Sequence, residues 1–174
     1  GEEQSVSGYT ATASTGLYDV ENDFTFSGTA EAKRTDEGTT NMGLAADQFV
    51  NTNDNFATVT FNVTDGYQTI TQIDEVVVTI TGHYNTTDYD GEAHSVSGYE
   101  VEISNDLYTV NGFTFSGTAE AARTDAGTTK MGLAAEQFAN TNGNFDVTFS
   151  VTDGELEITK LPVTVTITGN KERI

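Results

Sequence analysis

The chain has 174 residues, which is enough for one ordinary domain or for two small ones. Its 27 acidic side chains outnumber the 7 basic ones and give a formal net charge of -20, so it is expected to repel nucleic acids and anionic membranes. The lack of cysteine excludes disulfide bonds, thiolate metal sites and cysteine nucleophiles. Since no apolar run approaches the roughly 18 residues of a membrane span, we expect no nucleic-acid partner and no direct membrane insertion.

An internal repeat divides the chain into two copies of one sequence. Matched segments begin at Phe24 and Phe113 ("FTFSGTAEA"), at Met42 and Met131 ("MGLAA"), and at Val78 and Val165 ("VTITG"). We therefore predict two tandem modules, residues 1–82 and residues 83–174. Repetition in series adds length or further weak binding sites to an array, whereas a catalyst gains little from it, so we expect no enzyme activity.

Strand and helix signals follow the same order in both copies. "FTFSG" at 24–28 and again at 113–117 alternates apolar and polar residues, as strands do. "GLAADQF" at 43–49 and "GLAAEQF" at 132–138 are rich in Ala and predict one or two helical turns. Because Thr, Val, Phe and Tyr favour strands, we predict a mostly-β fold: two small β modules with sandwich- or grasp-like sheets, each with one short helical segment.

Each copy then alternates apolar and polar residues on both sides of a turn. "VTFSVTDGELEI" at 147–158 predicts a β-hairpin that turns at Asp153–Gly154 and directs Leu156 inward. The counterpart at 59–70 has Gln68 in place of Leu156, so we expect this strand of the first copy to be less deeply buried.

The last element is a strand whose place in the module is open. "VTVTITG" at 163–169 alternates strictly, and its counterpart occupies 76–82. We expect this strand to close each module, which puts the boundary after residue 82. In the alternative it opens the following module; the first module then lacks an edge, the strand at 163–169 is surplus, and the combination favours strand exchange between molecules.

Three segments carry a resemblance to a known kind of protein: "TDYDGEAHSVSGY", "ARTDAGTT" and "VTFSVTDGELEITKLPVTVTITG". They resemble MBG or YDG-type repeats, the mostly-β tandem modules of large bacterial cell-surface proteins, over nearly the whole of each copy. The resemblance implies a segment of a longer secreted or wall-anchored protein at the bacterial surface, with neighbouring repeats of the same chain as partners. The first copy departs from the pattern, because it begins after the Tyr-Asp pair and has no Pro before its last strand. The family supplies no catalytic residues to transfer.

Three alternating carboxylates are the candidate metal ligands. Asp88, Asp90 and Glu92 lie in "TDYDGE", and such spacing before or around a glycine occurs in calcium loops. A complete calcium loop needs further oxygen ligands that the segment does not supply. We therefore expect a solvated turn at Gly91 and no obligatory cofactor, and we keep calcium as the one candidate.

Two matched arginines and two matched tyrosines are the candidate ligand-binding residues. Arg34 and Arg123 could anchor an acidic ligand, or could form hydrogen bonds or an ion pair within their own loops. Tyr9 and Tyr99 follow a matched "SVSG" and could bind a protein or a sugar, or pack at the rim of the core. We expect the structural role for both pairs.

Two functions remain after these exclusions. The first is a structural stalk or spacer of a bacterial surface adhesin, outside the cell, that projects a distal binding region. The alternative is a repeated module that binds a host surface protein, an immunoglobulin or a glycan, with avidity from repetition.

Overall fold

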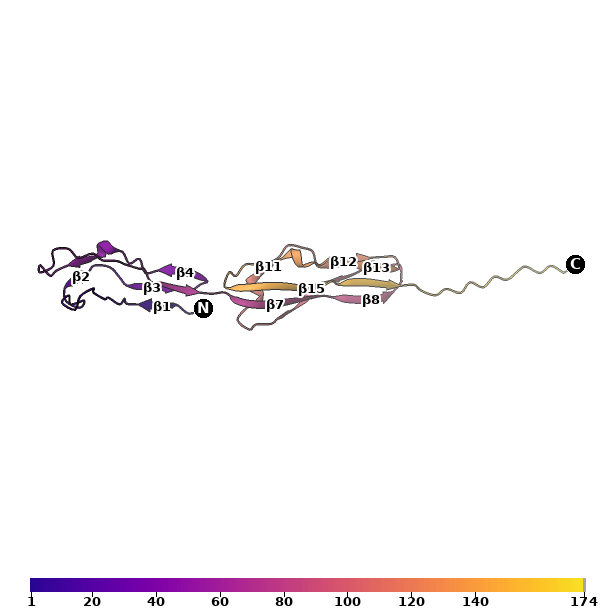
Figure 1. Ribbon diagram of the computed structural model, residues 1–174. Helices are drawn as coiled ribbons and strands as arrows, with labels where there is room; N and C mark the ends of the chain where they lie inside the picture. The colour runs from indigo at the N-terminus through magenta and orange to yellow at the C-terminus, as the bar shows by residue number, and fades with distance from the viewer. Residues whose placement is uncertain (174) are drawn as a thin grey trace. The chain divides into compact units, whose positions relative to one another are not determined.

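The structure, a computed structural model, describes residues 1–173 (Figure 1). It consists of short β-strands and single turns of 3-10 helix, so the predicted mostly-β fold is confirmed. The chain divides into two compact units, residues 1–73 and residues 74–174. Each unit is described by itself below.

Unit 1 contains three antiparallel strand pairs. These are β1 (Gln4–Ser7) with β3 (Glu31–Arg34), β2 (Phe24–Phe26) with β5 (Phe49–Asn51), and β4 (Gly38–Asn41) with β6 (Tyr67–Ile70). One 3-10 turn, η1 (Ala46–Gln48), precedes β5.

Unit 2 repeats these pairs and adds further strands. Its first three-stranded sheet has the order β10 (Tyr99–Ile103), β7 (Ile73–Gly82), β15 (Phe145–Thr152), and its second has the order β13 (Gly127–Lys130), β16 (Glu155–Thr159), β8 (Tyr84–Asp88). Two antiparallel pairs complete it: β9 (His94–Ser97) with β12 (Glu120–Arg123), and β11 (Phe113–Phe115) with β14 (Phe138–Asn140). Its 3-10 turns are η2 (Val110–Gly112) and η3 (Ala135–Gln137).

Strand β7 is the central strand of the first sheet of unit 2. It lies between β10 and β15 and runs antiparallel to β10. Figure 1 shows β7 beside β15. Its alternate residues Val76, Val78 and Ile80 are 1%, 0% and 0% exposed, so they form the centre of the core. The strand at 76–82 therefore opens unit 2, and the boundary lies after residue 73. The expected boundary after residue 82 is wrong because hydrogen-bond partners from later in the chain decide where this strand belongs.

The matching strand predicted at 163–169 does not form in the described chain. Residues 160–173 have no secondary structure, and Val163, Val165 and Ile167 are 77%, 76% and 89% exposed. These residues correspond in the repeat to the buried side chains of β7. Since no described segment pairs with them, the expectation that this strand closes its module is wrong as well.

The predicted hairpin at 147–158 is also corrected. β15 and β16 lie in different three-stranded sheets and do not pair with each other. The Asp153 carboxylate accepts hydrogen bonds from the backbone N–H groups of Gly132, at 3.1 Å, and Leu133, at 2.8 Å, and so holds the bend at which the chain changes sheets. The predicted alternation is right: Leu156 is buried, whereas its counterpart Gln68 is only partly buried.

The predicted helical segments are confirmed as single 3-10 turns. In η1 the side chain of Gln48 accepts a hydrogen bond from the backbone of Ala45, at 2.9 Å, and donates one to the carbonyl of Gly43, at 3.1 Å. Gln137 accepts the same bond from Ala134 in η3, at 3.0 Å. The matched glutamine therefore explains why the turn recurs in both units.

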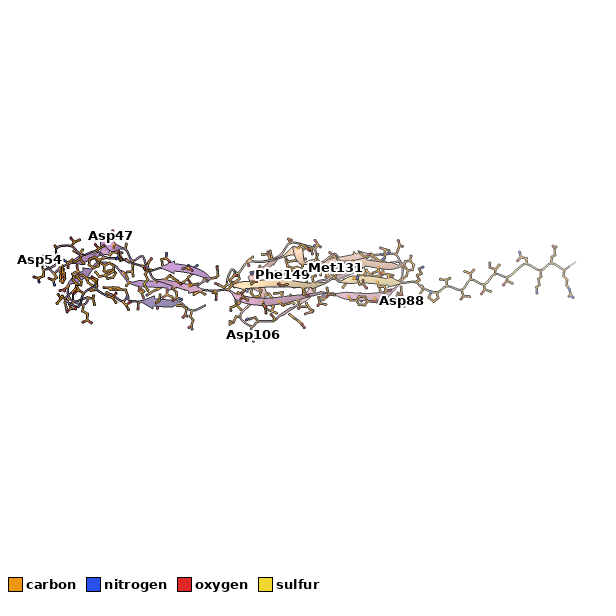
Figure 2. The ribbon with its side chains drawn as sticks, in the orientation of Figure 1. Asp47, Asp54, Asp88, Asp106, Met131 and Phe149 are labelled. Carbon is orange, nitrogen blue, oxygen red and sulfur yellow. The ribbon has the colours of Figure 1, made fainter. Side chains whose placement is uncertain are left out.

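The fully buried core lies almost wholly in unit 2. Of the buried apolar side chains in the described residues, only Ala32 belongs to unit 1. Figure 2 shows Met131 and Phe149 among the strands of unit 2. The counterparts of the buried Tyr108, Phe138 and Phe145 in unit 1 are only partly buried. Unit 1 thus has the aromatic residues of this core without its full enclosure.

Candidate functional site

Two of the three candidate calcium ligands, Asp88 and Asp90, use their carboxylates in different hydrogen bonds. Asp88, at the end of β8, accepts one from the hydroxyl of Thr159. Asp90 Oδ1 accepts one from the backbone N–H of Glu92, at 2.9 Å, and lies 3.0 Å from His94 Nε2; these two contacts lower the pKa of Asp90. Within residues 1–173, no group of three or more His, Asp or Glu side chains is arranged to hold a metal ion. The structure therefore does not bring the three carboxylates together, and calcium stays a prediction.

The guanidinium of Arg123 is engaged by its own loop. Nε donates to the carbonyl of Asp125, at 2.5 Å, and Nη1 donates to the carbonyl of Thr128 and the hydroxyl of Thr129, both at 2.9 Å. Nη2 donates to the carbonyl of Ala126, at 3.2 Å. The expected hydrogen bonds to loop carbonyls are confirmed, and they tie the β12–β13 connection to one side chain.

Arg34 forms the same set of contacts in unit 1. It donates to the carbonyl of Asp36, at 2.9 Å, and to the hydroxyl of Thr40, at 3.1 Å. A glycine lies under the guanidinium in both units. At Gly127, whose φ is +140°, an added Cβ would lie 2.6 Å from Arg123 Nη2. The spacing of Arg and Gly in "RTDxGTT" is therefore explained by this arginine-filled loop.

The two candidate tyrosines pack on phenylalanines of their own units. The ring of Tyr99 meets those of Phe115 and Phe138 edge-on, at centroid distances of 5.3 and 5.5 Å. Tyr9 repeats this contact in unit 1, although it is 42% exposed. The expected packing role is confirmed for both rings, and the structure does not join the tyrosines and arginines into one site.

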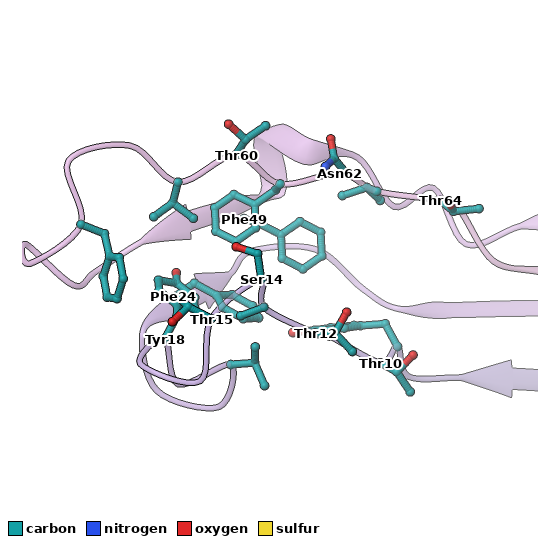
Figure 3. Close-up of a pocket in the computed structure, with 18 of the residues that line it drawn as sticks. Thr10, Thr12, Ser14, Thr15, Tyr18, Phe24, Phe49, Thr60, Asn62 and Thr64 are labelled. Atoms are coloured by element: carbon teal, nitrogen blue, oxygen red, sulfur yellow. The ribbon is translucent and has the colours of Figure 1, made fainter.

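Unit 1 contains a groove. It has a volume of about 640 Å³ and lies between two extended segments, residues 9–15 and residues 58–64. In Figure 3, Thr10 and Thr12 lie on one segment and Thr60, Asn62 and Thr64 on the other. Thr, Ser and Asn side chains edge the groove, and aromatic rings form its floor.

Sequence reasoning kept a missing edge in the first module only as the alternative to the expected boundary, and it did not identify this groove. The signal was in the repeat: residues 9–13 match β10 and residues 58–64 match most of β15. In unit 2 these two strands are the neighbours of β7. Neither segment is a strand in unit 1, because no described segment lies between them to accept and donate hydrogen bonds. Aligning the copies and asking which strand each segment needs would have found the groove.

The groove and the arginine loops are not explained by similarity to a characterised protein. No protein-family model, curated protein or solved structure matches the chain. In the described residues, no helix has the length and apolar character needed to cross a membrane. Any functional conclusion therefore depends on the geometry above and on the sequence.

Proposed function

We propose that the chain is a stalk segment of a bacterial surface adhesin: two tandem repeats, outside the cell, that project a distal binding region. The observation that carries the proposal is the joint between the repeats. β6 ends at Ile70, and β7 begins at Ile73 and becomes the central strand of unit 2. Only Thr71 and Gln72 therefore separate the last strand of unit 1 from the strand that enters the core of unit 2.

A joint of this kind suits a load-bearing array. Residues Val76, Val78 and Ile80 of β7 are buried, and the strand has hydrogen-bonded neighbours on both sides. Pulling the strand out would break backbone hydrogen bonds and expose this apolar surface together. A flexible linker would instead let each repeat move independently of the next. The partners under this proposal are the neighbouring repeats of the same chain.

The acidic surface supports the same function. Asp47, Asp54 and Asp106 are exposed on the outside of their units (Figure 2). With a net charge of -20, neighbouring stalks repel one another and stay dispersed.

The alternative, a repeated module for a host protein, an immunoglobulin or a glycan, has weaker support. The guanidinium groups of Arg34 and Arg123 donate to their own loops. The rings of Tyr9 and Tyr99 pack on phenylalanines. The residues proposed for binding are thus already used to stabilise the units.

Distance measurements by electron paramagnetic resonance test the stalk. Thr25→Cys and Thr114→Cys provide matched, exposed labelling positions in a chain without other cysteines. At concentrations where the chain is monomeric, we expect a narrow distance distribution that broadens when about ten Gly and Ser residues are inserted between Thr71 and Gln72. Equally broad distributions before and after the insertion would contradict a stiff joint.

A binding screen tests the alternative. The labelled chain is applied to mucins, immunoglobulins, extracellular-matrix proteins and a glycan array, with and without calcium. A spacer shows no saturable binding at high micromolar concentration. Saturable binding that disappears in a folded Tyr99→Ala or Arg123→Lys variant would replace the stalk with the binding module.

A further inference from the structure

We propose that the groove of unit 1 accepts a β-strand, and that its ligand is residues 163–169 of a second copy of this chain. The inserted strand takes the place in unit 1 that β7 takes in unit 2. The proposal goes beyond the stalk function and does not depend on it, because it follows from comparing the two units.

The walls of the groove offer unpaired backbone to such a strand. Residues 9–13 and residues 57–64 form no backbone hydrogen bond to another residue of the described chain. Their counterparts in unit 2 are β10 and the part of β15 that ends at Thr152, which both bond to β7. A strand between the two walls would therefore satisfy donors and acceptors on both of its edges.

The floor of the groove already has the geometry that β7 meets in unit 2. The Phe49 and Phe61 rings are stacked at 5.7 Å and 28°, and their counterparts Phe138 and Phe149 are stacked at 5.7 Å and 27°. The Phe26–Phe49 stack also matches its counterpart, at 4.8 Å and 25° against 4.7 Å and 24°. Because the aromatic floor is preformed, a strand can bind without the cost of reorganising it.

The segment at 163–169 has the side chains that this floor accepts. Val163, Val165 and Ile167 match the three buried residues of β7 in identity and spacing. All three are largely exposed in the described chain, an apolar row without cover. Burying such a row on the phenylalanines removes apolar surface from water and is the main driving force for insertion.

A pair of glycines adds a steric match. At the end of β7, Gly82 passes so close to Gly154 that an added Cβ would lie 2.2 Å from the backbone nitrogen of Gly154. The repeat keeps both positions: Gly169 ends the donor segment and Gly66 lies at the corresponding point of unit 1. The inserted segment at 163–169 and the groove that accepts it therefore each have a glycine at the point where their backbones would cross.

The pairing of β7 with β10 predicts the register of the inserted strand. Thr79 lies opposite Glu102 in unit 2, so Thr166 of the donor should lie opposite Thr12 of the acceptor. The groove and the segment at 163–169 are different surfaces of the chain. A contact between different surfaces associates copies head to tail, and its geometry decides between a closed ring and an open chain.

Disulfide trapping tests both the site and the register. One chain carries only Thr12→Cys and a second, of different length through a tag, carries only Thr166→Cys; neither has another cysteine. Directly opposed antiparallel residues have Cα atoms about 4.5–5.5 Å apart, which suits a disulfide. We expect mild oxidation of an equimolar mixture to give more of the mixed dimer than random pairing of the two thiols would produce. Because each chain has one thiol, the bond joins two copies.

The matched control shifts the register. Thr10→Cys with Thr164→Cys is four residues out of register, or about 13 Å along the strand, so the mixed dimer should form no more often than random pairing of the two thiols predicts. Equal trapping by the control and the test pair would overturn the proposed register. Failure of the test pair to give excess mixed dimer would overturn the insertion.

Sedimentation equilibrium supplies an independent readout on the full chain. The average mass should rise with concentration, and Val165→Lys should keep the chain monomeric because the lysine would enter the aromatic floor. Thr164→Lys adds the same charge at the position of Val77, which faces outward from β7 at 38% exposure, and should leave association intact. A monomer at every concentration, or association that Val165→Lys does not reduce, would overturn the proposal.

Discussion

At the scale of single residues, two side chains stabilise loops that the strand pattern alone would leave undefined. Arg123 connects four oxygen atoms of the β12–β13 loop, and the hydroxyl of Tyr108 donates to the carbonyl of Gly112, at 2.6 Å, close to Asn140 Oδ1, at 2.9 Å. Both residues have counterparts in unit 1 with similar contacts. In both cases, the hydrogen bonds of one side chain hold a connection between strands in place.

Arg123→Lys should lower the free energy of unfolding of unit 2 by about 1–2 kcal/mol. An ammonium group cannot reach the four oxygens that the planar guanidinium spans. Urea unfolding measures the change. Arg173→Lys, the same substitution at an exposed residue, is the control and should change nothing. A stability equal to that of the parent would show that the loop does not depend on the fork of hydrogen bonds.

Because Tyr108 is buried, we expect unit 2 to lose stability at alkaline pH. Burial raises the pKa of its hydroxyl above 10.0, so the folded unit favours the neutral form. The neutral hydroxyl contributes its full stabilisation of unit 2 below a pH near 10, the pKa of tyrosine in the unfolded chain. This stabilisation is lost as the pH rises from there through the higher pKa of the folded unit. Urea unfolding of unit 2 at about pH 8 and about pH 11 should show a smaller decrease in Tyr108→Phe than in the parent. An equal decrease in both would assign the effect to other groups.

At the scale of elements, strand β7 decides the organisation of unit 2. The alternation of apolar residues in β7 would suit any half-buried strand. Its central position also requires that its backbone pass close to another backbone segment at one end. The backbones of Gly82 and Gly154 meet there, where the first and second three-stranded sheets of unit 2 adjoin. A side chain at this crossing would push the sheets apart.

Gly82→Ala should therefore lower the free energy of unfolding of unit 2 by about 2–4 kcal/mol. Gly169→Ala, its counterpart in the repeat, has no atom within 4 Å of an added Cβ and should leave the stability of the monomer unchanged. Thermal unfolding of the two variants side by side measures the difference. The idea of a crossing that only glycine fits would be abandoned if both variants melted at the temperature of the parent.

At the scale of the whole molecule, two copies of one sequence reach different degrees of enclosure. Unit 2 buries Val78, Ile80 and Leu156 completely, and unit 1 has an open groove above the matching aromatic floor. Since buried apolar surface is the main favourable contribution to folding, the two units should differ in stability.

Hydrogen exchange followed by mass spectrometry should reveal this difference. We expect the strands of unit 1, such as β2, to exchange faster than their counterparts in unit 2, such as β11, because the monomer lacks a central strand beside the groove. The comparison needs no substitution, since the repeat supplies its own control. Equal protection of matched strands would show that the groove does not weaken unit 1.

Much of the structure of this protein could be predicted from local sequence patterns, without knowledge of the tertiary fold. The duplicated sequence, the mostly-β class, the alternation around Asp153 and the single helical turns were all readable from neighbouring residues, because side-chain period and propensity are local properties. The loop role of Arg123 could also be anticipated, since a matched arginine in an acidic chain needs oxygen partners nearby.

Tertiary structure alone decided how the strands pair. β15 and β16 were expected to form a hairpin, but they lie in different sheets, because each finds its hydrogen-bond partners far along the chain. The clearest case is "VTITG", which begins at Val78 and again at Val165. The first copy is a buried central strand and the second is exposed chain. The same five residues differ because only the first has a β10 and a β15 on either side.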